Sequence, residues 1–261
     1  FYFFQSAIRG IGSAMIYPVL VAYSQQLFPE KTGFGSGVMT AGFGAGGIVW
    51  APIATALLAK TSIDQTLVIL GLASLILVLV LSIFIQTPPQ TFKDEMSEIV
   101  WKNPKIEKAM SLKNRKQMVR DPIFYLFFFT LCFGMAGGAM IISQARQIVG
   151  FLHGGFFTLT MLGLVVSMIS AGGTIGRFIF GYLSDKIGRM SALLLVSSIG
   201  FISTLFMMVV ASPVLFVVFL IMIVLVYGGY TSMVAPLIGF FFGTVNVPDN
   251  YPVMFAAFGA A

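Results

Sequence analysis

Charged residues are scarce in this chain of 261 residues: Asp, Glu, Lys and Arg together make up 9%, whereas soluble domains carry about 25%. Cysteine and histidine are scarcer still, with one of each, Cys132 and His153. A single cysteine excludes an intrachain disulfide, and so few cysteines and histidines argue against a zinc site. The sequence therefore predicts neither a soluble domain nor a bound metal or cofactor.

Apolar residues are abundant instead. Hydrophobic residues make up 58% of the chain, mean hydropathy is +0.97, and there are 28 glycines and 27 phenylalanines. A membrane-spanning helix needs about 20 mostly apolar residues, and the chain offers seven such spans and a truncated eighth. We therefore predict an all-α polytopic membrane protein that lies in a lipid bilayer. The predicted spans are residues 1–28, 33–58, 65–85, 122–143, 156–182, 190–210 and 213–242, with the eighth beginning near 250.

Basic residues gather on one side of these spans. The only long polar stretch, 86–121, holds eight bases among five acids; with this loop inside, Lys31, Lys186 and Arg189 also fall inside, and only Lys60 and Arg146 fall outside. A bias of eleven to two follows the rule that cytoplasmic loops are rich in Lys and Arg. The net charge of +6 thus reflects membrane orientation, and no nucleic-acid partner is expected.

The spans lack the acids and dyads of an intramembrane enzyme. All acids that we could place fall in loops, and His153 falls in an outer loop. Paired aspartates, a serine with a basic partner or zinc ligands within the membrane would be needed for hydrolysis there. We therefore expect no enzyme activity.

One base, Arg177, falls inside a span. It precedes Asp185 by eight residues, which is about 12 Å along a helix in a hydrocarbon layer of about 30 Å. A charge at that depth is costly and usually faces a wet cavity or a partner. By the same count, Tyr17 and Tyr230 fall at depths similar to that of Arg177, and Tyr227 falls one turn further out. Each of these tyrosines either offers its hydroxyl group to the same cavity or serves ordinary packing.

The turn that follows carries a motif. Gly181, Leu183, Asp185, Gly188 and Arg189 match the G-x-L-x-D-x-x-G-R pattern, and the chain here resembles the major facilitator superfamily between its helices 8 and 9. The resemblance implies twelve helices in two six-helix bundles, of which this chain would hold helix 4 to part of helix 11, about seven and a half. It also implies that Gly181, Asp185, Gly188 and Arg189 latch one bundle to the other in the outward-open state. The superfamily usually has a second base where this chain has Met190.

Further segments resemble the oxalate/formate antiporter family. They are residues 9–18, 28–33, 41–44, 118–124, 227–229, 242–244, 250–251 and 255–259. In that family the arginine that corresponds to Arg177 binds a substrate carboxylate, and the oxalate exchangers carry a lysine at the position of Phe258. With one cation instead of two, a monocarboxylate becomes the favoured substrate. Monocarboxylate transporters share the arginine but place an aspartate where this chain has Gly173.

We therefore expect a secondary transporter of small organic anions, a monomer in the cell membrane, that works by alternating access and as an exchanger. Arg177 would bind the anion, with Tyr17, Tyr227, Tyr230 and Phe258 lining the site. The alternatives are a proton-coupled monocarboxylate symporter, a facilitator of another solute, and a fragment or sensor that transports nothing. The expected divisions are residues 1–85 from the first bundle, a cytoplasmic linker over 86–121, and 122–261 from the second bundle.

Overall fold

The computed structural model describes residues 9–58, 60–84, 110–152 and 159–261. These residues form helices and connecting turns, without a strand among them, so the all-α prediction is confirmed. The helices are α1 (Arg9–Leu27), α2 (Thr32–Leu58), α3 (Ile63–Ser82), α5 (Arg115–Val119), α6 (Pro122–Leu152), α7 (Leu159–Ile187), α8 (Arg189–Val209), α9 (Pro213–Phe242) and α10 (Val247–Ala260), with 3₁₀ turns η2 (Pro29–Lys31) and η3 (Thr244–Asn246).

Helix boundaries match the predicted spans with three exceptions. Helix α7 continues past the predicted end at 182 to Ile187, so Asp185 and Lys186 lie within the helix and not in the predicted turn. Helix α6 continues past the predicted end at 143 to Leu152. A short helix, α5, also forms within the stretch that we predicted as a loop. Its start is explained by reciprocal capping, because the Asn114 side chain accepts from the Gln117 N–H (3.0 Å) while the Gln117 side chain accepts from the Asn114 N–H (3.1 Å).

Several earlier predictions fall on residues that the structure does not describe. They are the first eight residues of the first span, most of the basic stretch 86–121, and His153.

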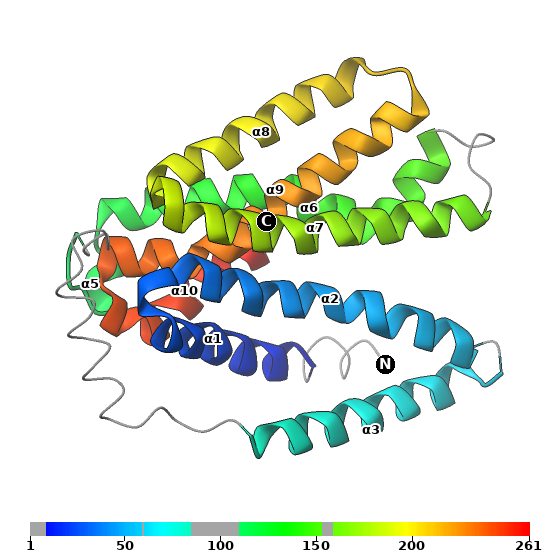
Figure 1. The fold of residues 1–261 in the computed structure, drawn as a ribbon, viewed down its shortest axis with the longest axis horizontal. Helices are drawn as coiled ribbons and strands as arrows, with labels where there is room; N and C mark the ends of the chain where they lie inside the picture. The colour runs from blue at the N-terminus through cyan, green and yellow to red at the C-terminus, as the bar shows by residue number, and fades with distance from the viewer. Residues whose placement is uncertain (1–8, 59, 85–109, 153–158) are drawn as a thin grey trace.

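The long helices run along a common axis, with α9 in the middle of the bundle (Figure 1). Sixty-one per cent of the α9 span is buried, against 6% of the α3 span at the edge. Helix α7 packs against both α9 and α2, so it joins the helices from the two ends of the chain. Five of the described helices, α3, α6, α7, α8 and α9, are long and apolar enough to cross a membrane.

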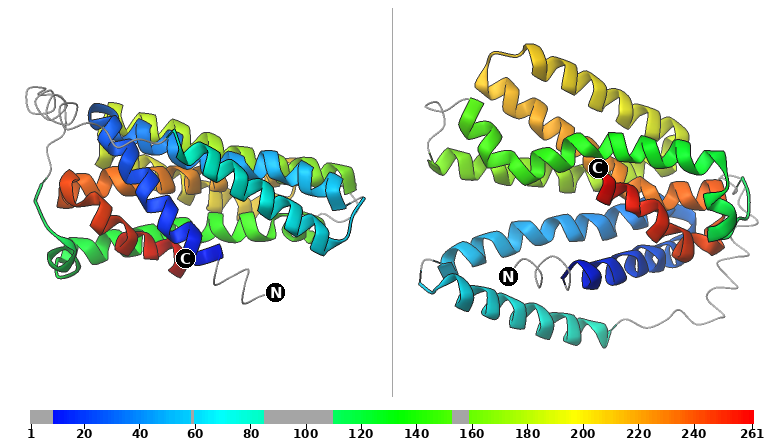
Figure 2. Two further views of the ribbon diagram at one scale, coloured as in Figure 1. Left: turned by 90° about the horizontal axis from the view of Figure 1, so that it is seen from below. Right: turned by 180° about the vertical axis from the view of Figure 1, so that it is seen from behind.

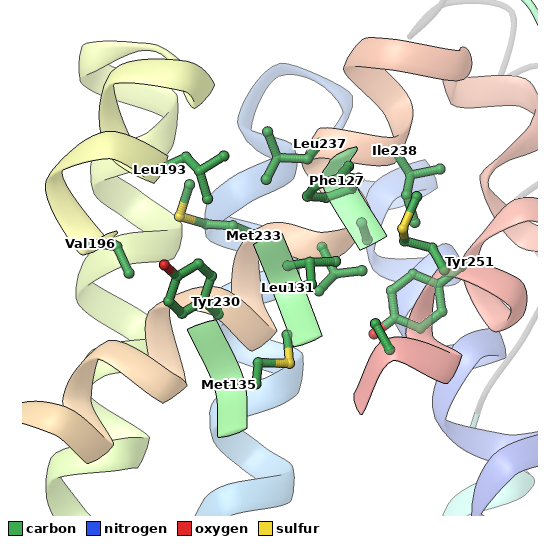
Figure 3. Close-up of a cluster of buried hydrophobic side chains, with 14 of the residues drawn as sticks. Phe127, Leu131, Met135, Leu193, Val196, Tyr230, Met233, Leu237, Ile238 and Tyr251 are labelled. Atoms are coloured by element: carbon green, nitrogen blue, oxygen red, sulfur yellow. The ribbon is translucent and has the colours of Figure 1, made fainter. Parts of the chain in front are cut away.

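The largest apolar core lies among α6, α8, α9 and α10. Figure 3 shows side chains from these four helices meeting around α9. Several are fully buried, and burial of a large apolar side chain stabilises a fold by about 1.5–3 kcal/mol in water. Those with less than 2% exposure include Leu131, Met135, Met233, Leu237, Ile238 and Tyr251.

Four connections gather at one end of the bundle, which we call the α5 end: η2, the α7–α8 turn, the α9–α10 turn and α5 itself (Figure 1). Residues 110–113 close the C-terminus of α9, where the Met110 N–H donates to the Phe240 carbonyl (2.7 Å) and the Lys113 N–H to the Phe242 carbonyl (2.9 Å). Carbonyls at a helix end have no partner within the helix. The segment just before α5 is therefore held against α9.

Asp121 joins this segment to α6. Its carboxylate accepts from the Ile123 N–H (3.0 Å) at the start of α6 and pairs with the Lys113 ammonium. Both contacts favour the charged form, the Lys113 bond most, and they hold the pKa of Asp121 below its ordinary value.

Candidate functional site

Arg177 lies in the middle of α7 and is 8% exposed. Its Nε donates a hydrogen bond to the Thr231 hydroxyl on α9 (3.2 Å), which itself donates to the Gly228 carbonyl (2.8 Å). The guanidinium carbon stands 5.7 Å from the centre of the Tyr227 ring, within the range of a cation–π contact. The partners of the guanidinium on α9 are therefore a neutral hydroxyl and an aromatic face.

The opposite side of this guanidinium faces α2. A Cβ atom at Gly44 would overlap Nη1 of Arg177 and would lie 3.0 Å from the Thr174 hydroxyl. Glycine at position 44 is therefore what gives the guanidinium its place. Helix α2 comes from the first part of the chain, and α7 and α9 come from the last part. Arg177 therefore lies between these two sets of helices, and its side chain is buried there.

Among the described residues, Arg177 has no acidic partner: the interactions of its guanidinium are with Thr231 and Tyr227. One turn before it, at Gly173, there is no side chain to compensate the charge. Burial of a cation without a counter-charge is costly. The site is therefore suited to hold an anion.

Aromatic rings connect Arg177 to α1 and α10. Between ring centres, Tyr227 lies 6.3 Å from Phe258, and Phe258 stacks on Phe255 at a distance of 5.2 Å. The ring centres of Phe255 and Tyr17 are 5.1 Å apart. Three of the predicted site residues, Tyr17, Tyr227 and Phe258, thus belong to one chain of rings that ends beside Arg177.

A hollow of about 510 Å³ adjoins these rings on α1 and α2. Tyr17 and Phe43 are among the residues that line it, and their ring centres are 5.2 Å apart. Phe43 immediately precedes Gly44, but neither Gly44 nor Arg177 is among the lining residues. The remaining lining residues are Gly12, Ile16, Leu20, Val21, Met39 and Gly42.

Tyr230 is placed elsewhere. Its hydroxyl is hydrogen-bonded to the Ser197 hydroxyl on α8 (2.7 Å), and its ring fills the space above Gly134 on α6. Figure 3 shows it beside Val196 within the large apolar core. Its depth matches that of Arg177, but its side chain serves packing within the C-terminal helices.

The motif residues lie at the α5 end, where α7 meets α2. The Asp185 carboxylate accepts hydrogen bonds from the backbone N–H groups of Gly33 (2.9 Å) and Phe34 (2.8 Å). An acid at a helix N-terminus satisfies unpaired N–H groups and complements the helix dipole. The helix start that Asp185 caps is that of α2, which comes from the first part of the chain.

The other motif residues make this contact possible. Gly188 has φ +87°, a conformation that glycine adopts without strain, and it lets α8 begin directly after α7. Arg189 then donates to the Thr32 hydroxyl (3.0 Å) and lies over the Phe240 ring. A Cβ at Gly181 would lie 2.5 Å from the Gly33 carbonyl oxygen, so glycine is required where α7 and α2 touch.

Sequence reasoning missed four contributors to these contacts: Thr32, Gly44, Thr231 and Phe255. Gly44 and Phe255 lie in segments that carried the resemblance, which was a usable signal. Thr32 also lies in such a segment, residues 28–33, whereas Thr231 is a hydroxyl residue in apolar surroundings and gave no signal. Helices also touch closely at Gly33, Gly37, Gly172 and Gly176, whereas Gly42 and Gly46 lie in open or loosely packed space.

Comparisons with known proteins identify the family. A profile of the Major Facilitator Superfamily matches residues 1–261. An uncharacterised MFS-type transporter, YhjX, of Escherichia coli (strain K12) is 25% identical over 256 residues, which cover 96% of this chain and 60% of the relative. An oxalate:formate antiporter of Oxalobacter formigenes is 24% identical over 255 residues, which cover 96% of this chain and 57% of that protein.

This chain therefore spans less than two thirds of the length of these relatives. Both relatives are named as transporters, and apolar spans of transmembrane length agree with that class. The match over the whole sequence is decisive: the chain is a multi-pass membrane protein and belongs to the major facilitator superfamily.

Proposed function

We propose that this chain forms part of a secondary transporter that exchanges small organic anions, monocarboxylates above all, across the cell membrane. The observation that carries the proposal is the buried guanidinium of Arg177, which lies between two sets of helices and has only neutral contacts in the described structure. A carboxylate suits it, because a guanidinium binds the two carboxylate oxygens with two parallel hydrogen bonds.

The rings around Arg177 favour a small anion with a single charge. Phe258 stands 6.3 Å from Tyr227, and neither ring can neutralise a second carboxylate. A dianion would leave one of its charges desolvated without a cation, which costs several kcal/mol. One cation between aromatic walls therefore supports a monocarboxylate better than oxalate, although a relative at 24% identity is named an oxalate:formate antiporter.

Exchange is favoured over proton coupling for a related reason. A proton-coupled mechanism needs a group that gains a proton together with the anion, and a carboxylate beside the arginine would supply it. At the position one turn before Arg177 the chain has Gly173. A transporter that changed between its two open states without a bound anion would leave the charge of Arg177 in the membrane without a counter-charge. This change is therefore disfavoured unless an anion is bound, as exchange requires.

The contact at the α5 end supports the proposal of alternating access. In this structure Asp185, Gly181 and Arg189 hold α7 and α8 against the start of α2, so we infer that the cytoplasmic side is closed. The basic bias places this end inside. Separation of these groups would open the site to the cytoplasm, while the site stays between the two bundles near the bilayer midplane.

Counterflow in proteoliposomes tests the proposal. Vesicles that contain the full-length protein are loaded with an unlabelled carboxylate, and uptake of a labelled one is measured for formate, acetate, lactate, oxalate and a neutral sugar. We expect trans-stimulated uptake of the monocarboxylates, weaker uptake of oxalate, and none of the sugar. Uptake that depends on a proton gradient but is not stimulated by internal carboxylate would favour the symporter alternative.

A further inference from the structure

A basic cluster lies at α5, away from Arg177. Arg115 and Lys116 belong to α5, Arg120 follows it, and all three side chains are exposed. Lys113 is paired with Asp121, but in the described parts of the chain none of these three bases is joined to a carboxylate. Three exposed cations within six residues create a positive field at this surface.

These three bases share a hollow with apolar side chains. Together with Val119 and Val253, they line a space of about 440 Å³ between α5 and α10. Met118, which is fully buried, anchors α5 in the core, and reciprocal capping at Asn114 fixes its start. The hollow is therefore held by structured elements, and its wall is partly cationic and partly apolar.

The hollow also lies at a fixed height relative to the membrane. The α6 span begins at Pro122, directly after the cluster, so the three bases stand at the edge of the hydrocarbon layer, level with lipid headgroups. Figure 2 shows α5 beside α10 at one end of the bundle in both views. A ligand here would meet phosphate-binding groups and an apolar wall at the same time.

We propose that the hollow between α5 and α10 binds the headgroup of an anionic phospholipid. The phosphate would lie among Arg115, Lys116 and Arg120, where arginine holds phosphate oxygens with paired hydrogen bonds. The glycerol and first methylenes would lie on Val119 and Val253. Basic pockets beside membrane helices on the cytoplasmic side suit this class of ligand, whereas free phosphate would gain nothing from the valines.

Native mass spectrometry of the full-length protein tests this, with phosphatidylglycerol and phosphatidylcholine of identical acyl chains added in turn. Each surface base contributes about fivefold to the binding of an anionic lipid. We therefore expect the variant Arg115→Gln/Lys116→Gln/Arg120→Gln to bind phosphatidylglycerol about a hundredfold more weakly than the wild type. Phosphatidylcholine should bind weakly to both proteins.

The matched control is Lys60→Gln, which removes an exposed base at the other end of the bundle and should leave lipid binding unchanged. Phosphatidylglycerol binding by the triple variant within twofold of the wild type would overturn the proposal, and so would equal binding of phosphatidylcholine. Displacement of the lipid by an equal concentration of inorganic phosphate would assign the site to free phosphate instead.

A second arm needs no variant and covers the case in which the triple variant does not fold. Lipid binding by the wild type is measured while the salt concentration is raised from about 50 mM to about 500 mM, which shortens the Debye length severalfold. We expect the affinity for phosphatidylglycerol to fall at least tenfold. An affinity that does not change with salt would refute a site made of three exposed cations.

Discussion

Asp185→Asn is the most informative change at the contact between α7 and α2. The carboxylate accepts from two N–H groups, of Gly33 (2.9 Å) and Phe34 (2.8 Å). An asparagine keeps one acceptor oxygen and replaces the other with an NH₂ group, which cannot accept. One N–H at the start of α2 therefore loses its partner, and the negative charge at that helix N-terminus disappears.

The lost hydrogen bond is the larger of the two effects. A hydrogen bond to a charged group contributes about 1.5–3 kcal/mol, and a charge at a helix N-terminus about 0.3–1 kcal/mol, rising to about 2 where it is partly buried. The two terms overlap, so we expect the joined state to lose about 2–4 kcal/mol. At 1.4 kcal/mol per tenfold, this shifts the equilibrium between the joined and separated states about 30-fold to several hundredfold towards separation.

Double electron–electron resonance, which measures the distance between two spin labels, would detect this shift. Spin labels attached at Phe28, beside η2, and at Met190, at the start of α8, lie on the two sides of the contact, and both positions are exposed. In a Cys132→Ser background, the wild type should give mainly one short distance. The Asp185→Asn variant should add a longer distance as a major population.

Glu30→Gln is the matched control, since Glu30 is an exposed acid in η2 at the same end of the bundle. It removes the same charge without a hydrogen bond at the α2 start, and its distance distribution should match that of the wild type. If the Asp185→Asn distribution superimposes on both, the capping bonds do not hold the helices together and the reasoning fails.

Two further predictions concern the anion site and the α5 end. Gly44→Ala puts a Cβ where Nη1 of Arg177 lies, so the guanidinium must shift from Thr231, and carboxylate binding measured by calorimetry should weaken about tenfold or more. The control Gly46→Ala, on the same helix but in loosely packed space, should bind as the wild type does. Because the pKa of Asp121 is lowered, its contribution to stability is present above the ordinary carboxyl value and is lost as pH falls through the lowered one. Thermal unfolding from pH 7 to pH 3 should therefore show Asp121→Asn as less stable at neutral pH, with the difference disappearing in acid; an equal difference at every pH would contradict this.

The sequence predicted the helices well because one physical requirement dominates. In a bilayer each span must be apolar and must satisfy its own backbone hydrogen bonds, so hydropathy alone locates the boundaries of α2, α8 and α9. Starts and ends marked by chemistry were also visible, such as Pro213 at the first turn of α9. Helix α5 was missed because it depends on a local capping pair, Asn114 with Gln117, and not on hydropathy.

Contacts between helices were harder to predict. Distance along a span gives the depth of a residue but not the neighbour that it faces. Tyr227 and Tyr230 are one turn apart on α9, yet one lies beside Arg177 and the other bonds Ser197 on α8. The partners of Asp185 on α2 are about 150 residues away in sequence, and no local pattern in this chain connects them.

The central claim is that Arg177 binds the carboxylate of the transported anion. Equilibrium binding of a labelled monocarboxylate to the purified full-length protein tests it most directly, with the wild type compared with Arg177→Gln, Arg177→Lys and the distant control Lys60→Gln. Truncation of a buried charged partner costs about 2–5 kcal/mol, so Arg177→Gln should bind at least about 30-fold more weakly, Arg177→Lys should recover only part of the loss, and Lys60→Gln should match the wild type. Wild-type affinity in Arg177→Gln would contradict the account.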